Sequence, residues 1–506
     1  MVFKGYNDAM KNGVMFNAYP DSLGGRLCCS ASLLQNELRD CFSSFYILPS
    51  VFHSDLDRGF GVVDYGLNEV YADTEDLKRL QEAGITLMFD LVMNHASSSS
   101  VMFRDVLKHG TASPYRGFFI DWNDFWKDKG TMNSEGVIVP DDVYIHDMYF
   151  RKPGLPVLCV DLPDGKRIPF WNTFYQEIQH AQDGPVSFKA QLDLDIRSAQ
   201  VWDYYGDILK TLASYGAQYV RLDAFAYASK IAGKRNFWNE PETSEILTRI
   251  SAMAQKYGLS VLPEIHGTYA EHLNDMLSEQ GYLTYDFFVP GLLLWAMEKK
   301  DPSLLAVHAR QMAEMKAPCI HMLGCHDGIP VLDLKGLLEE EEIRELIHVL
   351  TARGGLVKNL HGAQNMYYQV NTTYFSALGE DTDHLSFARA VQLFLPGIPL
   401  VWYLDLFEGK NDYGAVERGG AGAHKEINRT NLSAAEIRER LHTPGVQEQI
   451  RLIRLRNTFP AFREGSAFEC TVRGHSAVFR YRYERYTAEL TADFSTFKYT
   501  VKTSTD

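Results

Sequence analysis

Positive charge is scarce in this chain. Its 506 residues include 50 Lys and Arg against 65 Asp and Glu, which gives a formal net charge of −15 at pH 7. No block of basic residues is longer than a few positions, so binding to nucleic acid or to an anionic membrane through bulk charge is disfavoured. An anionic ligand would need a local basic pocket that acts against the field of the whole protein.

Cysteines and long apolar runs are also few. The seven cysteines form no CxxC pair, which favours buried thiols in a reducing compartment over a disulfide framework. No run approaches the roughly 18 apolar residues of a membrane span, and the N-terminal MVFKGYNDAMKNG lacks the apolar core of a signal peptide. We therefore expect a cytoplasmic protein without a membrane partner. No helical pattern has metal-ligand spacing, so neither a metal nor another cofactor is expected.

What the chain does contain is an alternation of strand-like and helical segments. Eight short apolar runs are typical of buried strands: residues 13–20, 44–50, 85–95, 219–224, 259–266, 282–288, 319–327 and 397–405. Helical patterns precede most of them. This alternation predicts an α/β fold in the form of a (β/α)₈ TIM barrel. A doubly wound open sheet is the alternative, but no GxGxxG fingerprint follows the first strand.

The spacing of these runs predicts how the chain divides into domains. The catalytic barrel is assigned residues 1–96, 196–327 and 397–444. The connections 97–195, after the third strand, and 328–396, after the seventh, are too long for simple loops, so each is predicted to be an inserted subdomain. Residues 445–506 begin as a helix and then alternate with period two, which indicates a small C-terminal antiparallel β domain.

Charged residues interrupt one of the apolar runs. QYVRLDAFAYASK places Arg221 and Asp223 two residues apart, on the same face of a predicted strand. Burying an ion costs several kcal/mol, so this pair calls for an explanation. Other polar residues stand at the ends of other predicted strands: His95, Glu264, His326 and Asp327.

In a TIM barrel the carboxyl ends of the strands carry the active site. A retaining glycosidase needs a carboxylate nucleophile and a protonated carboxyl about 5–5.5 Å apart. Arg221 would keep Asp223 ionised, while the apolar neighbours of Glu264 would raise its pKa. Taken singly, each residue also suits a structural role, as an ion pair, a rim carboxylate, a capping histidine or a turn residue. Structural roles do not predict, however, that the charges fall on the ends of different strands.

Four ordered segments carry a resemblance to a known family: MFDLVMNH (88–95), VRLDAFAY (220–227), PEIH (263–266) and GCHD (324–327). In this order they resemble the α-amylase family of glycoside hydrolases. The resemblance implies that Asp223 is the nucleophile, Glu264 the general acid/base and Asp327 the transition-state stabiliser. It also implies a set of sugar-binding residues: Asp64, His95, Arg221, His326 and Arg429.

Within that family the chain is most similar to the sucrose phosphorylase group, on segments such as RGFGVVDY, RKPGLP, YQVNTTYFSALG and EINR. This implies a covalent glucosyl-enzyme that is attacked by inorganic phosphate, with α-glucose 1-phosphate as the product and no calcium. Arg151, Lys152, Tyr368 and Gln369 are the residues of these segments expected to bind substrate or phosphate; His361 and Lys410 are further candidates for phosphate.

The acceptor sugar depends on Arg151. Sucrose phosphorylases resemble one another in having a non-basic residue there, whereas related sucrose 6-phosphate phosphorylases carry an Arg that grips the phosphate of fructose 6-phosphate. Asn365 and Met366 stand where the plain sucrose enzymes have Leu-Asp. We therefore expect cleavage of sucrose 6-phosphate with inorganic phosphate. A clear match to the His of the phosphate-specific enzymes is missing.

Several alternatives stay open at this point. They are a sucrose, glucosylglycerol or glucosylglycerate phosphorylase, and a hydrolase or transglucosidase of the same fold. A non-enzymatic amylase-like binding protein is a third class, against which the intact carboxylate set speaks. The oligomeric state is left open, a homodimer included.

Overall fold

An eight-stranded parallel sheet forms the centre of the protein. The computed structural model describes residues 13–179, 187–361, 366–420 and 423–505. The strands of the central sheet are β1 (Met15–Ala18), β2 (Ser44–Ile47), β5 (Thr86–Val92), β13 (Ala217–Asp223), β14 (Ser260–Pro263), β15 (Thr284–Asp286), β16 (Cys319–Met322) and β20 (Ile398–Trp402). Seven of them lie within the predicted runs, and β13 begins two residues before its run, so the prediction of the strands is confirmed.

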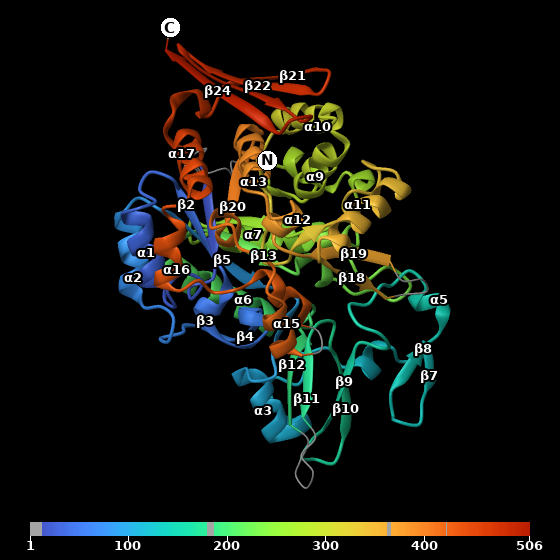
Figure 1. Cartoon of the computed structure of the whole chain (residues 1–506). Coiled ribbons are helices and arrows are strands. Elements are labelled where there is room, and N and C mark those ends of the chain that lie inside the picture. The colour runs from blue at the N-terminus through green and yellow to red at the C-terminus, as the bar shows by residue number, and fades with distance from the viewer. Residues whose placement is uncertain (1–12, 180–186, 362–365, 421–422, 506) are drawn as a thin grey trace.

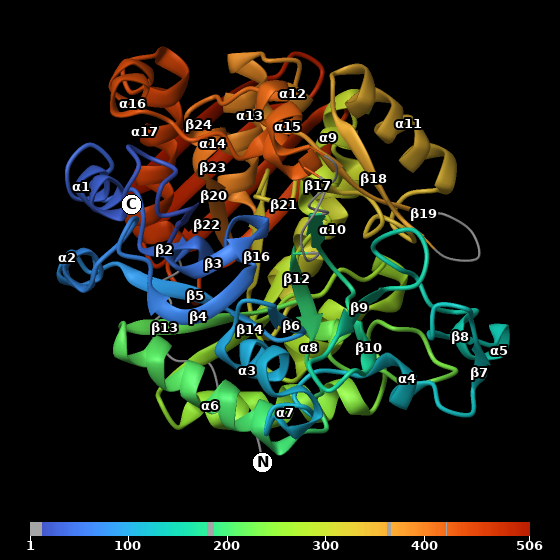
Figure 2. The same ribbon diagram turned by 90° about the horizontal axis from the view of Figure 1, so that it is seen from below.

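The sheet closes into a barrel. Its hydrogen-bonded order is β14-β13-β5-β2-β1-β20-β16-β15, and β14 contacts β15 at the remaining seam. Helices lie between the strands along the chain: α1 (Leu27–Gln35), α2 (Thr74–Glu82), α6 (Ala199–Ser214), α7 (Glu242–Gln255), α8 (Leu273–Glu279), α9 (Val289–Lys299), α10 (Ser303–Glu314) and α13 (Thr382–Phe394). Figure 2 shows helices α1, α2, α6 and α7 outside the strands. The (β/α)₈ TIM barrel is thereby confirmed.

The long connection after β5 forms a separate layer that projects from the barrel (Figure 1). It contains β6 (His95–Ser97), α3 (Val101–His109), α4 (Trp122–Phe125), β7 (Gly130–Met132), β8 (Ile138–Pro140), α5 (Asp142–Ile145), β9 (Val157–Asp161), β10 (Arg167–Trp171), β11 (Gln176–Gln179) and β12 (Ser187–Asp193). Trp122, Trp126 and Trp171 form a small hydrophobic core of its own. A buried ion pair fixes β12 to the loop after β13, because Lys230 Nζ lies 2.7 Å from Asp193 Oδ2.

The connection between β16 and β20 also carries a sheet. It comprises β17 (Ile329–Pro330), α11 (Glu340–Ala352), β18 (Leu356–Leu360), β19 (Met366–Asn371) and α12 (Tyr374–Ala377). The two connections meet where the backbones of Phe150 and His361 pair as an antiparallel bridge. Residues from both can therefore line one cavity.

The C-terminal segment forms an antiparallel sheet at the opposite end of the molecule (Figure 1). It follows α17 (Pro444–Thr458) and consists of β21 (Ala467–Arg473), β22 (Ser476–Tyr483), β23 (Tyr486–Asp493) and β24 (Lys498–Thr505). The predicted period-two pattern is confirmed. Alternate residues such as Phe479 and Leu490 are buried beneath it.

All seven cysteines are free. Cys41, Cys319, Cys325 and Cys470 are buried, while Cys28, Cys29 and Cys159 are partly exposed, so the expectation of buried thiols holds for four of them. Among the helices of the described residues, none has the length and apolar character needed to cross a membrane.

Candidate active site

A narrow cavity lies where the barrel strands end. The space that the centre of a water molecule can reach in it is about 50 Å³. Its polar lining consists of Asp57, His95, Arg151, Asp223, Tyr227, Glu264, His266, His326, Asp327, Tyr368 and Lys425. Asp223 is the last residue of β13, and Glu264 directly follows β14. The predicted convergence of Asp223, Glu264 and Asp327 is therefore present.

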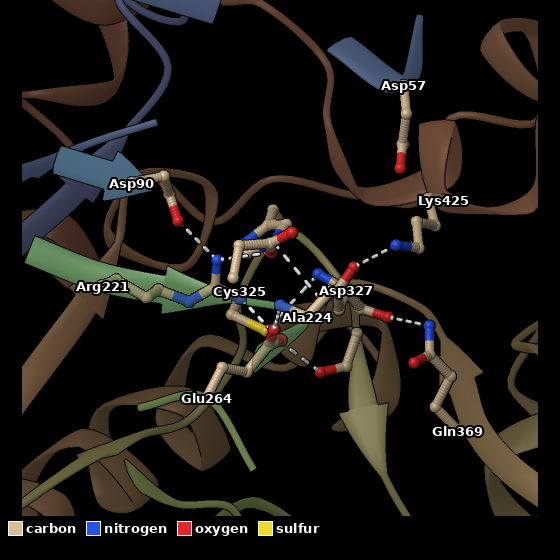
Figure 3. Close-up of polar contacts among 12 residues, drawn as sticks. Asp57, Asp90, Arg221, Ala224, Glu264, Cys325, Asp327, Gln369 and Lys425 are labelled. Atoms are coloured by element: carbon tan, nitrogen blue, oxygen red, sulfur yellow. Dashed lines mark hydrogen bonds and ion pairs between the residues drawn. The ribbon is translucent and has the colours of Figure 1, made fainter. Parts of the chain in front are cut away.

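Arg221 organises three carboxylates at this site. Its side chain is 3% exposed; Nη1 donates to Asp223 Oδ1 at 2.8 Å and Nη2 lies 2.6 Å from Glu264 Oε1. Nη1 also donates to Asp90 Oδ1 of β5 at 2.5 Å, and the Tyr46 hydroxyl donates to the same carboxylate at 2.8–2.9 Å. Figure 3 shows Arg221 between Asp90 and Glu264. The charge inside the apolar strand is thus the hub of a carboxylate cluster.

One guanidinium cannot neutralise three buried carboxylates, and their pKa values diverge accordingly. Burial raises the pKa of Asp223 well above its usual range, and the nearby Glu264 charge adds to this against the opposing effect of Arg221. Burial also acts to raise the pKa of Glu264, but Arg221 and His266 outweigh it and hold that pKa below its ordinary value. The sequence-based expectation of a raised pKa at Glu264 is therefore wrong for the free site, because Arg221 reaches across to the neighbouring strand.

The rest of the Glu264 environment also favours its anion. Ala224 N donates to Glu264 Oε2 at 2.9 Å, from a left-handed backbone turn (φ 50°) directly after β13. His266 Nε2 lies 3.6 Å from Glu264 Oε1, and His266 Nδ1 lies 3.3 Å from Asp333 Oδ1. Although burial opposes it, these two carboxylates raise the pKa of His266 to about 9. His266 is therefore a cation at neutral pH.

Asp327 lies among cationic groups on the other side of the cavity. Its Oδ1 is 2.5 Å from Lys425 Nζ and 3.6 Å from Arg429 Nη2, and its Oδ2 is 3.3 Å from His326 Nε2. Burial alone would raise the pKa of Asp327, but these neighbours lower it well below the usual range. Gln369 Nε2 donates to the Asp327 carbonyl at 2.7 Å. Gln369 lines neither this cavity nor the second one described below, so it positions the Asp327 loop.

His95 lines the cavity, although it does not end the third strand as predicted. Strand β5 ends at Val92, and His95 opens the short strand β6. Its Nε2 lies 3.0 Å from the Phe60 carbonyl, which can only accept, so Nε2 carries the proton. Burial lowers the pKa of His95 to about 4 and keeps the ring neutral. Within the described residues its Nδ1 has no hydrogen-bond partner, which leaves an acceptor for a hydroxyl group.

Asp64 was predicted to bind the sugar, but it does not line this cavity. It lies on β4 (Gly61–Leu67) with its side chain 57% exposed and bonded to His53 Nδ1 at 2.7 Å, outside the cavity. Asp57, on the preceding turn η2 (Asp57–Gly59), lines the cavity instead and accepts from Arg429 Nη1 at 3.1 Å. Asp57 and Arg58 both have φ 47°, so the chain turns sharply and sends Asp57 inward. The sequence clue was the DRG turn that precedes Phe60.

A second, wider cavity adjoins the first and shares Arg151, Phe174 and Lys425 with it. It offers about 480 Å³ to the centres of water molecules. Six basic side chains line it, and no carboxylate among the described residues does: Arg151, Lys152, Lys358, His361, His424 and Lys425. In a chain of net charge −15 this is the local basic pocket that an anionic ligand requires.

Arg151 lies at the junction of the two cavities. Its guanidinium carbon is 4.3 Å from the ring centroid of Tyr368 and 5.4 Å from that of Phe174. Its Nε and Nη1 are buried and have no hydrogen-bond partner within the described ranges. Lys152 lines only the second cavity, where its Nζ bonds to Asn172 Oδ1.

Of the two further residues predicted to bind phosphate, one lines a cavity and the other does not. His361 lines the second cavity, whereas Lys410 pairs with Glu380 at 2.6 Å on the surface and lines neither cavity. Asn365 lies outside the described residues. Sequence reasoning missed a set of cavity residues: Asp57, Phe174, Tyr227, His266, Lys358, His424 and Lys425. Four of them carried a signal: Asp57 opens the DRG turn, Tyr227 and His266 end the quoted segments VRLDAFAY and PEIH, and Lys425 adjoins EINR.

Ligand atoms of Glu264, His266 and Asp327 lie within 4.8 Å of one another, as a metal site would require. The donor set does not suit a cation, however. Arg221 already contacts Glu264, Lys425 contacts Asp327, and His266 is itself positively charged. A metal ion would meet three cations within this cluster, so these residues fit an uncharged or anionic ligand.

Comparison with known proteins agrees with this geometry. The model "Alpha amylase, catalytic domain" matches residues 41–313. The chain is also 47% identical to a sucrose 6(F)-phosphate phosphorylase of Ilumatobacter coccineus, across 99% of this chain and 97% of that protein. The chain belongs to the α-amylase family.

Other members of the α-amylase family place it more narrowly. The crystal structure of sucrose 6F-phosphate phosphorylase from Thermoanaerobacter thermosaccharolyticum superimposes with a TM-score of 0.88 at 32% identity, covering 99% of this chain and 97% of that one. A glucosylglycerol phosphorylase of Marinobacter adhaerens is 30% identical over 98% of this chain and 97% of its own length. The α-amylase of H. orenii shares the fold at 14% identity and a TM-score of 0.63. This α-amylase family member is therefore an enzyme with phosphorylases among its relatives.

Proposed function

We propose that this protein is a retaining α-glucoside phosphorylase that cleaves sucrose 6-phosphate. Inorganic phosphate is the second substrate, and α-glucose 1-phosphate and fructose 6-phosphate are the products. The narrow first cavity takes the glucosyl group, and the second cavity takes the phosphorylated fructosyl group.

In the first step Asp223 attacks the anomeric carbon and Glu264 gives a proton to the departing fructosyl oxygen. Both carboxylates contact the same guanidinium, so the nucleophile and the acid lie side by side beneath the glucosyl ring. Asp57, His95 and Asp327 supply acceptors for the sugar hydroxyls around that ring. The product of this step is a glucosyl ester of Asp223, with inversion at the anomeric carbon.

In the second step inorganic phosphate attacks the ester from the second cavity. Glu264, now ionised, accepts a proton from the phosphate, and the second inversion restores the α configuration. Arg151, Lys152 and Lys425 draw the phosphate toward the anomeric carbon. The small volume of the first cavity leaves little room for a competing water molecule.

The observation that carries the choice of substrate is the second cavity. It is lined by six basic side chains and, among the described residues, by no carboxylate. A neutral fructosyl group gains little from such a lining, whereas the 6-phosphate brings up to two negative charges. The buried nitrogens of Arg151 that lack a partner are suited to phosphate oxygens. The relatives named as sucrose 6(F)-phosphate phosphorylases support the same reading.

Incubation with sucrose 6-phosphate and inorganic phosphate tests this function. We expect release of glucose 1-phosphate, with a higher kcat/KM than for sucrose, glucosylglycerol or glucosylglycerate. A higher kcat/KM for one of these three would show that this compound, and not sucrose 6-phosphate, is the preferred substrate. Free glucose formed at the same rate with and without phosphate would make it a hydrolase.

A further inference from the structure

Lys358 is one of the six basic side chains that line the second cavity. It lies on β18, opposite Gln369 of β19, and its side chain is half-buried. Its Nζ is 5.4 Å from the centroid of the Tyr175 ring. Among the described residues no carboxylate or carbonyl oxygen lies within hydrogen-bonding or ion-pair distance of this ammonium group. It lines the cavity without a counter-ion from the described part of the chain.

The charges that surround Lys358 mostly repel it. Arg151, on the neighbouring connection, and Lys425, on η6 (Ala423–Asn428), disfavour its cation, while Asp57 and Asp327 favour it from the first cavity. Lys152, His361 and His424 share the same lining. Burial, followed by the repulsion from Arg151 and Lys425, lowers the pKa of Lys358 to about 7. A large fraction of free protein molecules thus carries a neutral Lys358 at physiological pH.

A phosphate group in this cavity would reverse the balance. Its dianion brings the counter-charge that the lining lacks, so the ammonium form of Lys358 becomes the favoured one. We propose that Lys358 recognises the 6-phosphate of the acceptor sugar and takes up a proton from solvent when that phosphate binds. This inference rests on the proposed function, since it concerns the phosphorylated sugar in the same site.

Proton uptake would contribute to specificity. The positive charge at Lys358 is then completed only when a phosphorylated sugar is present, and it adds a charge-assisted hydrogen bond worth about a 10- to 100-fold gain in affinity. Sucrose and fructose bring no counter-charge and leave Lys358 mostly neutral. Lys358 therefore favours sugars that carry a charged phosphate over uncharged sugars.

Calorimetric titration with fructose 6-phosphate at pH 8 tests the inference. At this pH the phosphate ester is already a dianion, because its second pKa is near 6. A histidine with an ordinary pKa of about 6.5 is mostly neutral, whereas His266, whose pKa is raised to about 9, stays mostly protonated. The slope of the observed enthalpy against buffer ionisation enthalpy gives the protons taken up. We expect about 0.9 proton per fructose 6-phosphate from Lys358, as a group with a pKa of 7 is about nine-tenths neutral at pH 8.

Two variants test whether Lys358 is the group that takes up the proton. Lys358→Arg keeps a cation that does not titrate, so it should bind fructose 6-phosphate but take up about 0.9 proton less. Lys358→Met should weaken binding about 10- to 100-fold. Lys152 also lines the cavity, and burial lowers its pKa to about 8, but it is unchanged in both variants, so the difference from the wild type isolates Lys358. Lys410→Met is the matched control on the surface and should change neither quantity.

The outcomes separate this inference from the proposed function. If the wild type binds fructose 6-phosphate no better than fructose, the proposed function fails. If it prefers fructose 6-phosphate but Lys358→Arg takes up as many protons as the wild type, only the role of Lys358 is refuted. Equal affinity of Lys358→Met and the wild type would likewise refute it.

Discussion

Arg151→Met is the substitution on which the assignment of the substrate depends most. It removes a guanidinium held between the rings of Tyr368 and Phe174 while keeping a long apolar side chain in that space. Two of its nitrogens are buried without partners in the described part of the chain. We interpret them as donors prepared for the phosphate of sucrose 6-phosphate.

The size of the effect follows from the burial of this group. Removing one partner of a buried, hydrogen-bonded charge pair costs about 2–5 kcal/mol. Each 1.4 kcal/mol is a factor of ten, so kcat/KM for sucrose 6-phosphate should fall about 30- to 4,000-fold. Sucrose cannot make the contact, and its kcat/KM should fall by a much smaller factor. The ratio of the two values is the quantity to measure.

The assay follows formation of glucose 1-phosphate with each donor at saturating inorganic phosphate. Arg197→Met is the control, because Arg197 is 65% exposed and pairs with Asp195 on the surface. A parallel loss on both donors in Arg151→Met would refute the reasoning. It would mean that Arg151 serves the glucosyl or inorganic phosphate site, which both donors share.

The same substitution makes a prediction about stability. Within the described residues Arg151 forms no ion pair, and a buried charge without a counter-ion destabilises the free protein. The ring contacts of Arg151 return only part of that cost. We therefore expect Arg151→Met to raise the free energy of unfolding by about 1–3 kcal/mol, with a higher Tm in thermal melts. A lower Tm would show that the guanidinium is already compensated in the free protein.

Three further predictions concern the catalytic cluster and its support. Asp223→Asn should lower turnover on the order of 10⁴-fold or more with little change in Tm; near-normal turnover would remove the nucleophile assignment. The pKa of His266 is raised to about 9 from an ordinary 6.5, so the stability it contributes is complete below pH 6.5 and lost as the pH rises to about 9. That contribution is at most about 3 kcal/mol, and denaturant titrations should show the decline in the wild type but not in His266→Gln. Lys230→Met leaves Asp193 buried without its partner and should cost about 3–5 kcal/mol in denaturant titrations, while the exposed Lys234→Met should change the free energy of unfolding little.

The barrel and the convergence of the carboxylates could be predicted because both depend on local patterns. A strand buried on both faces is a continuous apolar run, and a polar residue at its end can be found by its position alone. Asp223 and Glu264 are of this kind, as residues at or beside the ends of β13 and β14. The same reasoning failed for Asp64, because the left-handed turn at Asp57 and Arg58 decides which aspartate faces inward.

The acceptor side could not be predicted in this way. Lys358 is an ordinary surface residue type, and nothing local indicates that it folds inward. It meets Arg151 because two long connections, about 200 residues apart, pair through Phe150 and His361, and Lys425 joins them from η6, after β20. A cavity built by three separate segments depends on tertiary contacts that have no signature in any one of them.

The protonation state of Glu264 also depends on tertiary contacts. In the free site Arg221 lies against Glu264, and the pKa of Glu264 is low while that of Asp223 is high. A retaining first step needs the opposite arrangement, with a protonated Glu264 and an ionised Asp223. Because both carboxylates contact one guanidinium, we expect a displacement of Arg221 toward Asp223 to lower the pKa of Asp223 and raise that of Glu264. A sugar whose glycosidic oxygen accepts from Glu264 favours its protonated form, and the binding of the substrate thereby places the proton where the reaction requires it.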